Sequence, residues 1–336
     1  MTVELPHAPP IPGLRFRRLQ RPADDAALAD LHNAGFQADG IEFRLSAAQV
    51  GTWLDHPSRM DPTEDLLLAE VDGSLVAHVE AGWELDNDGG RNYNVWGQVH
   101  PSWRRRGLGT ALLRWNEERQ RKVGASHPAG GERRLQSWAD EGEAGRLALL
   151  EGNGYRVARY AFDMTRATLD EVPDFALPDG VEIRPASEAD LRAIWELEVE
   201  AFSDHWGAID GTEEAFARFR ADPTHDRSLW VVAWHGDEIV GQVLNRINAQ
   251  ANAELGMLRG RVNSVGVRKA WRRRGMGQAL VLASLNVLHR AGMTSASLGV
   301  DAENPHGALG IYERAGFRVA RRERIYRKPL DRSELG

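Results

Sequence analysis

The sequence has 336 residues, a length that suits two domains of ordinary size, each able to bury a core of its own. Hydrophobic residues make up 42% and charged residues 27% of the chain, near the averages for globular proteins, and no apolar run approaches the roughly 18 residues that suggest a membrane span. The formal net charge of -7 argues against a general nucleic-acid binder, and the absence of cysteine excludes disulfides, thiolate metal sites and cysteine nucleophiles.

Residues 1–13 form an N-terminal tail that lacks the basic start and apolar stretch of a secretory signal. We therefore expect a cytoplasmic protein with no membrane partner.

An internal repeat organises the rest of the chain. The stretch 14–36 resembles 181–202, VHPSWRRRGLGTALL at 99–113 resembles VRKAWRRRGMGQALV at 267–281, and 152–162 resembles 314–324. Because the three pairs keep the same order, the repeat indicates a domain duplication. The intervening segment 169–180 has two prolines, a glycine and four acidic residues without apolar periodicity, and it is predicted to be a linker between domains 14–168 and 181–330.

The second half alternates between strand and helix patterns. We predict a strand over 181–184, a helix from the N-cap Ser187 to about Phe202, and strands over 229–234 and 238–246 joined by a turn at 235–237. Another strand reaches about Val267, and a helix ends near Ala291. A strand over 295–300, a helix over 305–315 and a final strand pair from Phe317 complete the pattern. The order predicts a mixed α/β fold, with a twisted mixed sheet flanked by helices in each of the two tandem domains.

The loop WRRRGMG at 271–277 precedes a helix that begins near Met276. Glycine lets the backbone approach a ligand closely, and the unpaired N–H groups of a helix start attract anions. Arg272, Arg273 and Arg274 add bidentate donors. A plain turn with solvated arginines would explain one such loop. The same strand-to-helix context at 103–109 favours a cradle for phosphate or pyrophosphate.

Both loops resemble the acyl-CoA-binding signature V-x-P-x-x-R-x-x-G-x-G of the GNAT superfamily of N-acetyltransferases. In the first half Pro101 matches its proline, which Lys269 replaces in the second. The resemblance covers nearly all of both halves. It implies acetyl-CoA as co-substrate, with pyrophosphate on the loop amides and pantetheine along the preceding strand. The residues so implied are Val265, Val267, Arg272, Arg273, Arg274, Gly275, Met276, Gly277 and Gln278 in the second half, and Val99, Arg104, Arg105, Arg106, Gly107, Leu108, Gly109 and Thr110 in the first.

A second family motif is similar to the segment 300–317, which carries Asn304 and Tyr312. By that resemblance Asn304 contacts pantetheine or holds the local turn. Tyr312 would lie near the CoA sulfur and act as the general acid that protonates the departing thiolate. A packing aromatic residue on an amphipathic helix is the alternative for Tyr312.

The first half departs from this motif. Gly142 stands where Asn304 does, and Leu150 stands where Tyr312 does. Leucine cannot donate a proton, so the first domain is predicted to be degenerate, either binding CoA without using it or serving as a support. A shifted tyrosine, Tyr155 or Tyr160, is the alternative acid.

The general base and the acceptor pocket are less defined in the sequence. Glu254, just before the loop-binding strand, is the first candidate base; Asp301, Glu303 and a water held by Asn263 or Ser264 are alternatives. Within 203–216, Asp204 could attract a cationic amine and Trp206 could supply a ring face for it, unless the stretch is a solvated helix cap. No metal-ligand spacing occurs, so no metal is expected.

These patterns together predict an acyl-CoA-dependent N-acyltransferase that acts on a primary amine by direct attack. The acceptor is expected to be a small molecule, aminoglycoside-like or another metabolite, and the tandem arrangement resembles that of mycothiol synthases. A non-catalytic CoA-binding or regulatory module is the alternative, against which Asn304 and Tyr312 count. No nucleic-acid partner is expected, and monomer and homodimer both stay open.

Overall fold

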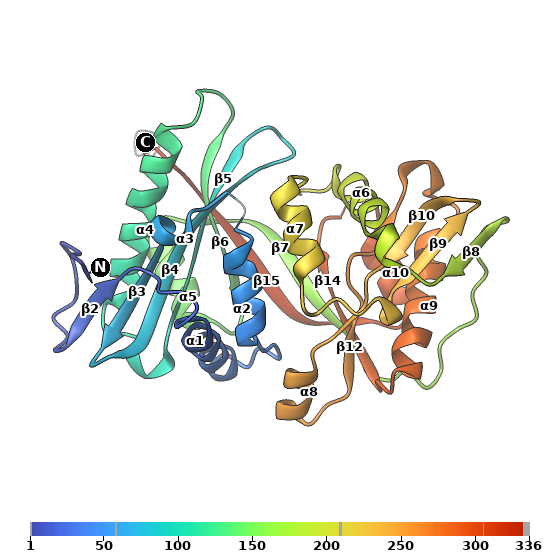
Figure 1. The fold of residues 1–336 in the computed structure, drawn as a ribbon, viewed down its shortest axis with the longest axis horizontal. Coiled ribbons are helices and arrows are strands. Elements are labelled where there is room, and N and C mark those ends of the chain that lie inside the picture. Colours follow the sequence, from blue (N-terminus) through green and yellow to red (C-terminus); the bar gives the residue numbers. More distant parts are fainter. Residues whose placement is uncertain (1, 58, 208–209, 305, 332–336) are drawn as a thin grey trace. The chain divides into compact units, whose positions relative to one another are not determined.

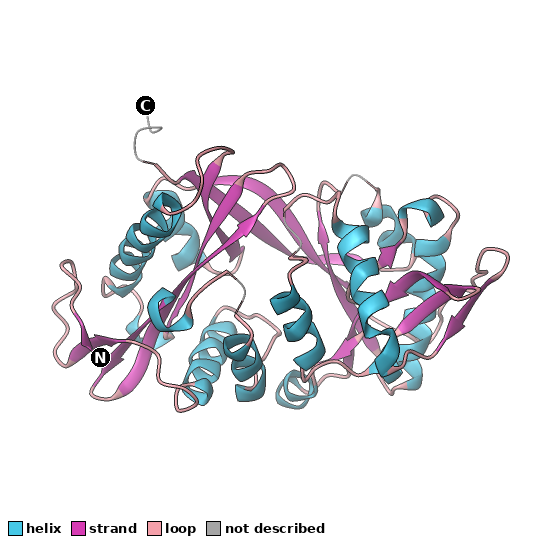
Figure 2. Cartoon of the chain, turned by 45° about the horizontal axis from the view of Figure 1, so that its top comes forward, coloured by secondary structure: helices cyan, strands magenta, loops and turns pink. Residues whose placement is uncertain are grey.

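The computed structural model describes residues 2–57, 59–207, 210–304 and 306–331. The chain forms two compact units, which we call the first unit (Met1–Arg159 with Glu323–Gly336) and the second unit (Tyr160–Arg322). Each unit combines β-sheet with helices, and the mixed α/β fold class predicted from the sequence is confirmed (Figure 1, Figure 2). Within the described ranges, no helix has both the length and the apolar character needed to cross a bilayer.

The first unit contains a sheet in the order β1-β2-β3-β4-β5-β6-β15. Its neighbouring strands are antiparallel except β5 and β6, whose parallel pairing runs from Arg91↔Arg133 to Asn94↔Gln136. The elements are β1 (Thr2–Val3), β2 (Leu14–Arg17), α1 (Asp25–Ala38), α2 (Ala47–Asp55), α3 (Pro62–Asp65), β3 (Leu66–Val71), β4 (Ser74–Leu85), β5 (Arg91–Val99), a 3-10 turn (Pro101–Trp103), α4 (Leu108–Ala125), β6 (Arg133–Asp140), α5 (Ala144–Gly152) and the start of β7 (Arg156–Arg166).

The strand β3 shows why this sheet is buried on both faces. Its sequence LLLAEV is apolar at nearly every position, as expected for a strand with helices on both sides. Alternate residues point to opposite faces. Leu67 packs in one cluster with Leu112 of α4, whereas Leu66 and Leu68 pack in another with Leu28 of α1. The helices α1 and α4 therefore cover opposite faces.

The second unit contains the strand order β7-β14-β12-β11 and a further sheet in the order β13-β10-β9-β8. Val231 of β9 packs in one core cluster with Leu280 of α9, and Val232 packs in a second cluster with Ile194 of α6, so this unit repeats the two-faced arrangement. The elements are β8 (Val181–Arg184), a 3-10 turn (Glu188–Asp190), α6 (Leu191–Phe202), α7 (Glu213–Ala221), a 3-10 turn (Arg227–Leu229), β9 (Val231–His235), β10 (Glu238–Val243), β11 (Arg246–Ile247), α8 (Ala249–Leu255), β12 (Arg259–Arg261), β13 (Gly266–Val267), a 3-10 turn (Lys269–Trp271), α9 (Met276–Arg290), β14 (Ser295–Asp301), α10 (Ala308–Arg314) and β15 (Arg318–Pro329).

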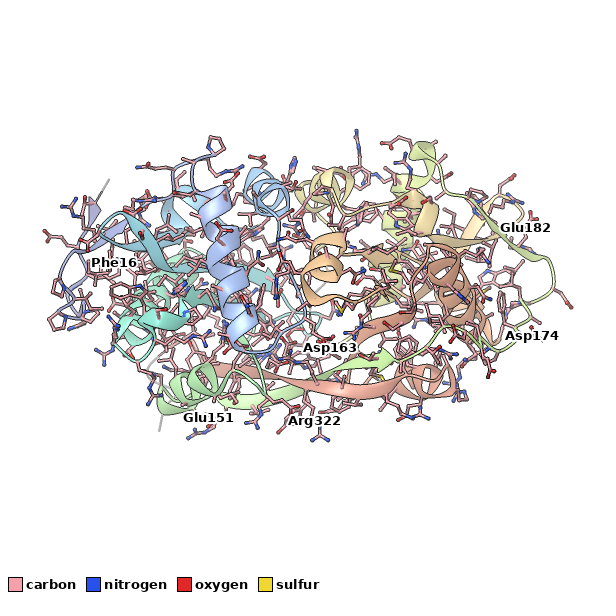
Figure 3. The ribbon with its side chains drawn as sticks, turned by 90° about the horizontal axis from the view of Figure 1, so that it is seen from below. Phe16, Glu151, Asp163, Asp174, Glu182 and Arg322 are labelled. Carbon is pink, nitrogen blue, oxygen red and sulfur yellow. The ribbon has the colours of Figure 1, made fainter. Side chains whose placement is uncertain are left out.

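Each unit completes its sheet with a strand from the other sequence repeat. The end of β15 pairs with β6 of the first unit, from Glu323↔Asp140 to Pro329↔Arg134. The end of β7 pairs with β14 of the second unit. Side chains support both pairings: the Tyr326 hydroxyl donates to Glu151 Oε1 at 2.8 Å, and Arg261 Nη1 donates to Asp163 Oδ1 at 3.2 Å; Glu151 and Asp163 are labelled in Figure 3.

The boundaries of the compact units therefore differ from the boundaries of the sequence repeats. The predicted linker 169–180 also packs on the second unit, because Leu169 is fully buried in its core and Val172, Phe175 and Leu177 lie against that core. The limits 14–168 and 181–330 describe the duplication, and they stay a prediction of where the repeats divide.

Several predicted elements differ in detail from the structure. The strand expected up to Val267 consists of two short strands, β12 and β13, separated by residues 262–265. The strand pair expected from Phe317 is one long strand, β15, because its two ends serve different units. The helix expected over 305–315 begins at Ala308, and Pro305 lies outside the described residues. Ser187, predicted as the N-cap of the helix, caps the 3-10 turn in a capping box with Asp190, and α6 itself begins at Leu191.

Candidate active site

The two arginine-glycine loops adopt the same backbone conformation. Arg105 and Arg273 both have φ of 63°, and the glycines before the helices, Gly107 and Gly275, have φ of 88° and 79°. These left-handed conformations suit glycine and are strained for arginine. The sequence duplication is therefore reproduced residue by residue, and the strained backbone occurs at the same place in both units.

Each loop ends at a helix start whose first N–H groups have no acceptor within the helix. The Ala279 N–H donates to Gly275 O at 3.1 Å, and the Ala111 N–H donates to Gly107 O at 3.1 Å. The three N–H groups before each of these bonds, at 276–278 and 108–110, precede the helical hydrogen-bond ladder. They form the positive end of α9 and of α4, which is a favourable place for phosphate oxygens.

The first arginine of each triplet holds the loop in place. Arg272 donates to Asp204 Oδ2 at 2.6 Å and to Val267 O at 3.3 Å. Arg104 makes the same contacts, with Asp39 at 2.7 Å and with Val99 O at 3.3 Å. Both guanidinium groups are thus engaged inside the protein, and each ties its loop to the end of the first helix of its repeat.

The other two arginines of each triplet have different surroundings. Arg274 lies over the Trp271 ring at 4.9 Å, and Arg106 lies over Trp103 at 4.6 Å, in cation–π contacts. The middle arginines, Arg273 and Arg105, are exposed and line the cavities beside the loops. Among the arginines predicted to bind CoA, these two are the ones best placed to reach an anion on the helix start.

A cavity of about 840 Å³ in the second unit adjoins the loop at 272–277. The parallel pairing of β12 with β14 ends at Arg261↔Ser297, and β13 begins only at Gly266. Residues 262–265 between them line the cavity, as do Val267, Gly275, Gly277 and Gln278. A strand that has parted from its neighbour presents backbone groups to a ligand, and this is the position predicted for pantetheine.

A carboxyl group that the sequence analysis missed, Glu198 of α6, lines the same cavity. Its Oε1 accepts a hydrogen bond from Ser264 Oγ at 2.9 Å, while its buried Oε2 has no hydrogen-bond partner among the described residues. Burial raises the pKa of Glu198, partly opposed by the Ser264 hydrogen bond and by Arg246. A carboxyl with a raised pKa takes up a proton more readily than an ordinary glutamate does, which suits Glu198 to proton transfer.

The sequence does contain a signal for Glu198. Ile194, Leu197 and Ala201 are buried on α6, and Glu198 follows Ile194 by one helical turn on the same face. A carboxyl on the buried face of an amphipathic helix is unusual, because burial of an unpaired charge is costly. The repeat comparison did not single it out, since His32 occupies the corresponding position of the first half.

Tyr312 of α10 also lines this cavity, with 8% of its surface exposed. Burial raises the pKa of its hydroxyl to about 12, so the phenol is protonated at neutral pH. Its ring packs edge-on against Phe317. Asn304 lines the cavity as well, and its Oδ1 accepts from the His306 backbone N–H at 2.9 Å, which is the turn-holding contact expected as one of its two roles.

Among the other predicted residues, Asp301 lines the cavity, whereas Glu254, Asp204 and Trp206 are not part of its described lining. Glu254 is exposed on α8, accepts from Gln250 Nε2 at 2.9 Å, and is not part of the described cavity lining. Asp204 is bonded to Arg272, which with His306 holds the pKa of this carboxyl at about 2. Trp206 is half-buried and also lies outside the described lining.

The first unit has its own cavity of about 750 Å³ beside the loop at 104–109. Leu150, 2% exposed, lines it where Tyr312 lines the other cavity. Trp96 occupies the position that corresponds to Ser264, and the Arg146 guanidinium lies over its ring at 4.1 Å. His32, at the position of Glu198, is buried, and this burial lowers its pKa to about 4. The first unit therefore keeps the arginine-glycine loop, but other residues occupy the positions of Glu198, Ser264 and Tyr312.

Comparison with known proteins agrees with this geometry. Residues 28–129 and 191–317 match the profile of the Acetyltransferase (GNAT) family. The mycothiol acetyltransferase of Geodermatophilus obscurus is 30% identical over 300 residues, covering 88% of this chain and 91% of that protein. The mycothiol acetyltransferase of Thermobispora bispora is 30% identical over 310 residues, covering 90% and 96% of the two chains.

Solved structures resemble the chain over nearly its whole length. A GCN5-related N-acetyltransferase from Sphaerobacter thermophilus has a TM-score of 0.69 and 30% sequence identity, covering 97% of each chain. A tandem GNAT protein from the clavulanic acid biosynthesis pathway has a TM-score of 0.66 at 18% identity, covering 96% of this chain and 100% of that one. The second likeness concerns the fold alone.

Proposed function

The chain belongs to the GNAT family of acetyltransferases and is an N-acetyltransferase, and from this premise we propose that its second unit transfers the acetyl group of acetyl-CoA to the primary amine of a small molecule. One observation carries the proposal. The arginine-glycine loop at 272–277, the parted strand, a protonated tyrosine and a carboxyl group of raised pKa all line the same cavity.

In the proposed complex, the pyrophosphate lies at the N–H groups of 276–278 with Arg273 beside it. Pantetheine runs along residues 262–267, where the strand has parted from β14. This course brings the thioester into the cavity that Tyr312 and Glu198 also line. The fixed position of Arg272 supports the loop, because its hydrogen bonds to Asp204 and to Val267 O tie it to the segment after α6 and to the end of β13.

The proposed reaction needs three proton transfers. The amine arrives as an ammonium ion, and Glu198 takes one proton from it, directly or through a water. The neutral amine then attacks the thioester carbon and forms a tetrahedral intermediate whose nitrogen carries a positive charge. Collapse of that intermediate breaks the carbon–sulfur bond, and the Tyr312 hydroxyl donates its proton to the departing thiolate. The nitrogen loses its second proton, which returns through water to the Tyr312 oxygen, and the amide product is neutral. No covalent enzyme intermediate is needed, in keeping with a chain that has no cysteine.

We propose that the first unit binds CoA without turning it over. The repeated loop conformation supports binding, because Gly107 and Arg105 present the same helix start as their counterparts do. Leu150 at the position of the acid, and the stacked Trp96 and Arg146 at the position of Ser264, argue against catalysis there.

Release of the CoA thiol from acetyl-CoA, measured against a panel of amines, tests the function. The panel should contain aminoglycoside-like sugar amines, amino-acid amines and the amine substrate of mycothiol acetyltransferases. Gly277→Glu should abolish the signal, because it places a carboxylate at the pyrophosphate position, and the matched change Gly109→Glu in the first unit should leave turnover in place. Loss of turnover in Gly109→Glu alone would reverse the assignment of the active unit, and thiol release with none of the amines would refute the proposed acceptor class.

A further inference from the structure

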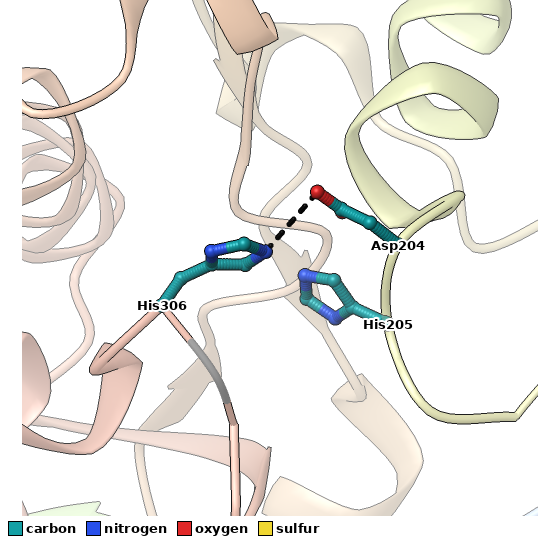
Figure 4. A group of neighbouring side chains, drawn as sticks. All are labelled: Asp204, His205 and His306. Atoms are coloured by element: carbon teal, nitrogen blue, oxygen red, sulfur yellow. Dashed lines mark ion pairs between the residues drawn. The ribbon is translucent and has the colours of Figure 1, made fainter.

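Three metal-binding types of side chain meet at the edge of the second-unit cavity. Asp204 and His205 follow the end of α6, and His306 precedes α10, 101 residues further along the chain. One ligand atom from each of the three side chains lies within 4.8 Å of the others (Figure 4). His306 Nε2 is 3.3 Å from Asp204 Oδ2.

The donor set of this cluster selects a class of ion. Two imidazoles and one carboxylate suit zinc and the neighbouring divalent transition metals, whereas magnesium and calcium prefer oxygen ligands throughout. Ligand atoms of a tetrahedral zinc site, with bonds of about 2.0–2.1 Å, lie roughly 3.4 Å apart. The His306–Asp204 pair has about this separation, at 3.3 Å, and the His205 ligand atom lies within 4.8 Å of both, so a small approach of the His205 ring completes the site.

Arg272 competes for the same two atoms of the Asp204–His306 pair, because its Nη1 donates to Asp204 Oδ2 at 2.6 Å and lies 3.3 Å from His306 Nε2, so a metal ion must take the other side of that pair. Arg272 also donates to Ala201 O at 2.8 Å and to Val267 O at 3.3 Å, so it stays anchored while Asp204 turns one oxygen to an ion and keeps the other for the guanidinium.

The duplication offers an internal comparison for this cluster. The first unit keeps the aspartate–arginine pair, with Asp39 and Arg104 at 2.7 Å. At the positions of His205 and His306 it has Gly40 and Ala144. Both imidazoles therefore occur only in the unit that carries Tyr312 and Glu198. The aspartate–arginine pair accompanies the arginine-glycine loop in both units. The first unit forms the same loop without the two histidines.

We propose that Asp204, His205 and His306 form a binding site for a divalent transition-metal ion of the zinc class. The ion joins the loop after α6 to the loop before α10. Both loops line the cavity, since His205 and His306 belong to its lining together with Asn304. A bound ion therefore ties these two loops together beside the cavity.

Binding of Zn²⁺ alone to the full chain, by calorimetry, and the visible absorption of added Co²⁺ test this proposal without any activity measurement. We expect one saturable site, together with a rise in Tm on addition of Zn²⁺. His205→Ala and His306→Ala should each weaken binding at least about 10-fold, since even residues behind the ligands contribute that much in metal sites. His289→Ala, an exposed histidine at the end of α9, is the matched control and should bind as the wild type does.

Two results would overturn the metal site. One is the absence of saturable binding by the wild-type chain. The other is equal binding by the His306→Ala and His289→Ala variants, which would make the cluster an ion pair between Asp204 and His306 and nothing more. Circular dichroism of both variants checks that each is folded, and Tm in the absence of metal shows whether His306 contributes to stability by itself.

Discussion

Replacing Glu198 by glutamine tests the assignment of the general base. Glutamine keeps the size of the side chain and an oxygen for the Ser264 hydroxyl, which lies 2.9 Å from Oε1, so the fold should be preserved. It cannot take a proton from the ammonium. General base catalysis contributes about 10²–10⁴-fold. We therefore expect kcat/KM for the amine to fall by that factor, which corresponds to about 3–5 kcal/mol of transition-state stabilisation.

The pH dependence of kcat/KM in the same assay tests the assignment of Glu198 independently. Glu198 acts only when ionised, and burial raises its pKa, so wild-type kcat/KM should fall as the pH drops through a value above the ordinary glutamate range. This fall in kcat/KM at low pH, the acid limb of the profile, should be absent in the Glu198→Gln variant. Ser264→Ala removes a hydrogen bond that lowers the pKa, so it should move the limb to higher pH.

Glu254→Gln is the matched control for this experiment, because Glu254 is the base predicted from the sequence and is exposed on α8. We expect wild-type rates and an unchanged profile for that variant. A Glu198→Gln enzyme with wild-type kcat/KM and an intact acid limb, under conditions in which chemistry limits turnover, would refute the assignment. If Glu254→Gln lost the limb instead, the sequence-based choice would be the correct one.

Further predictions concern the acid, the loop and the first unit. Tyr312→Phe keeps the buried ring but removes the proton donor, so steady-state kinetics should show kcat lower by about 10²–10⁴-fold with little change in KM for acetyl-CoA; wild-type kcat would contradict its role. Gly277→Ala should not lower Tm, since the added Cβ meets Ile311 Cδ1 at an ordinary 3.4 Å, yet calorimetry should show weaker CoA binding if the backbone contacts pyrophosphate closely. Leu150→Ala should lower the free energy of unfolding by about 2–5 kcal/mol in denaturant titrations and leave kcat unchanged. Calorimetry of the whole chain should find two CoA sites of unequal affinity, and a single site lost in Gly277→Glu would make the first unit a scaffold.

The sequence predicted the parts of the molecule that depend on local pattern. The helix ending at Arg290, the hairpin between β9 and β10, and the start of α9 just after Gly275 all follow from apolar periodicity, turn residues and glycine. The exchange of strand ends could not be predicted in this way. A strand pattern shows which face is buried but not which neighbour it pairs with, and β7 and β15 each carry suitable residues along their whole length.

The same limit explains what was missed in the candidate site. Glu254 was chosen because it lies near the loop-binding strand in the sequence, but the end of α8 directs it to the surface. Glu198 lies 66 residues from Ser264 along the chain, and only the packing of α6 brings the two together. Asp204 looked available for an amine, and its partner Arg272 is 68 residues away. Distances of this kind depend on tertiary packing, which single-sequence patterns do not contain.

The pairing of β15 with β6 also determines when the first unit can complete its fold during translation. The first unit lacks its last strand until residues 323–329 have been made, because β6 waits for the partners that begin at Glu323. Tyr326 and Leu330, both fully buried in its core, arrive at the same late stage. At about 5–20 residues per second, the intervening stretch of roughly 160 residues takes about 8–30 s to synthesise. Throughout that interval the edge of β6 lacks its native partner, so the early half of the chain presents an unpaired strand edge during translation.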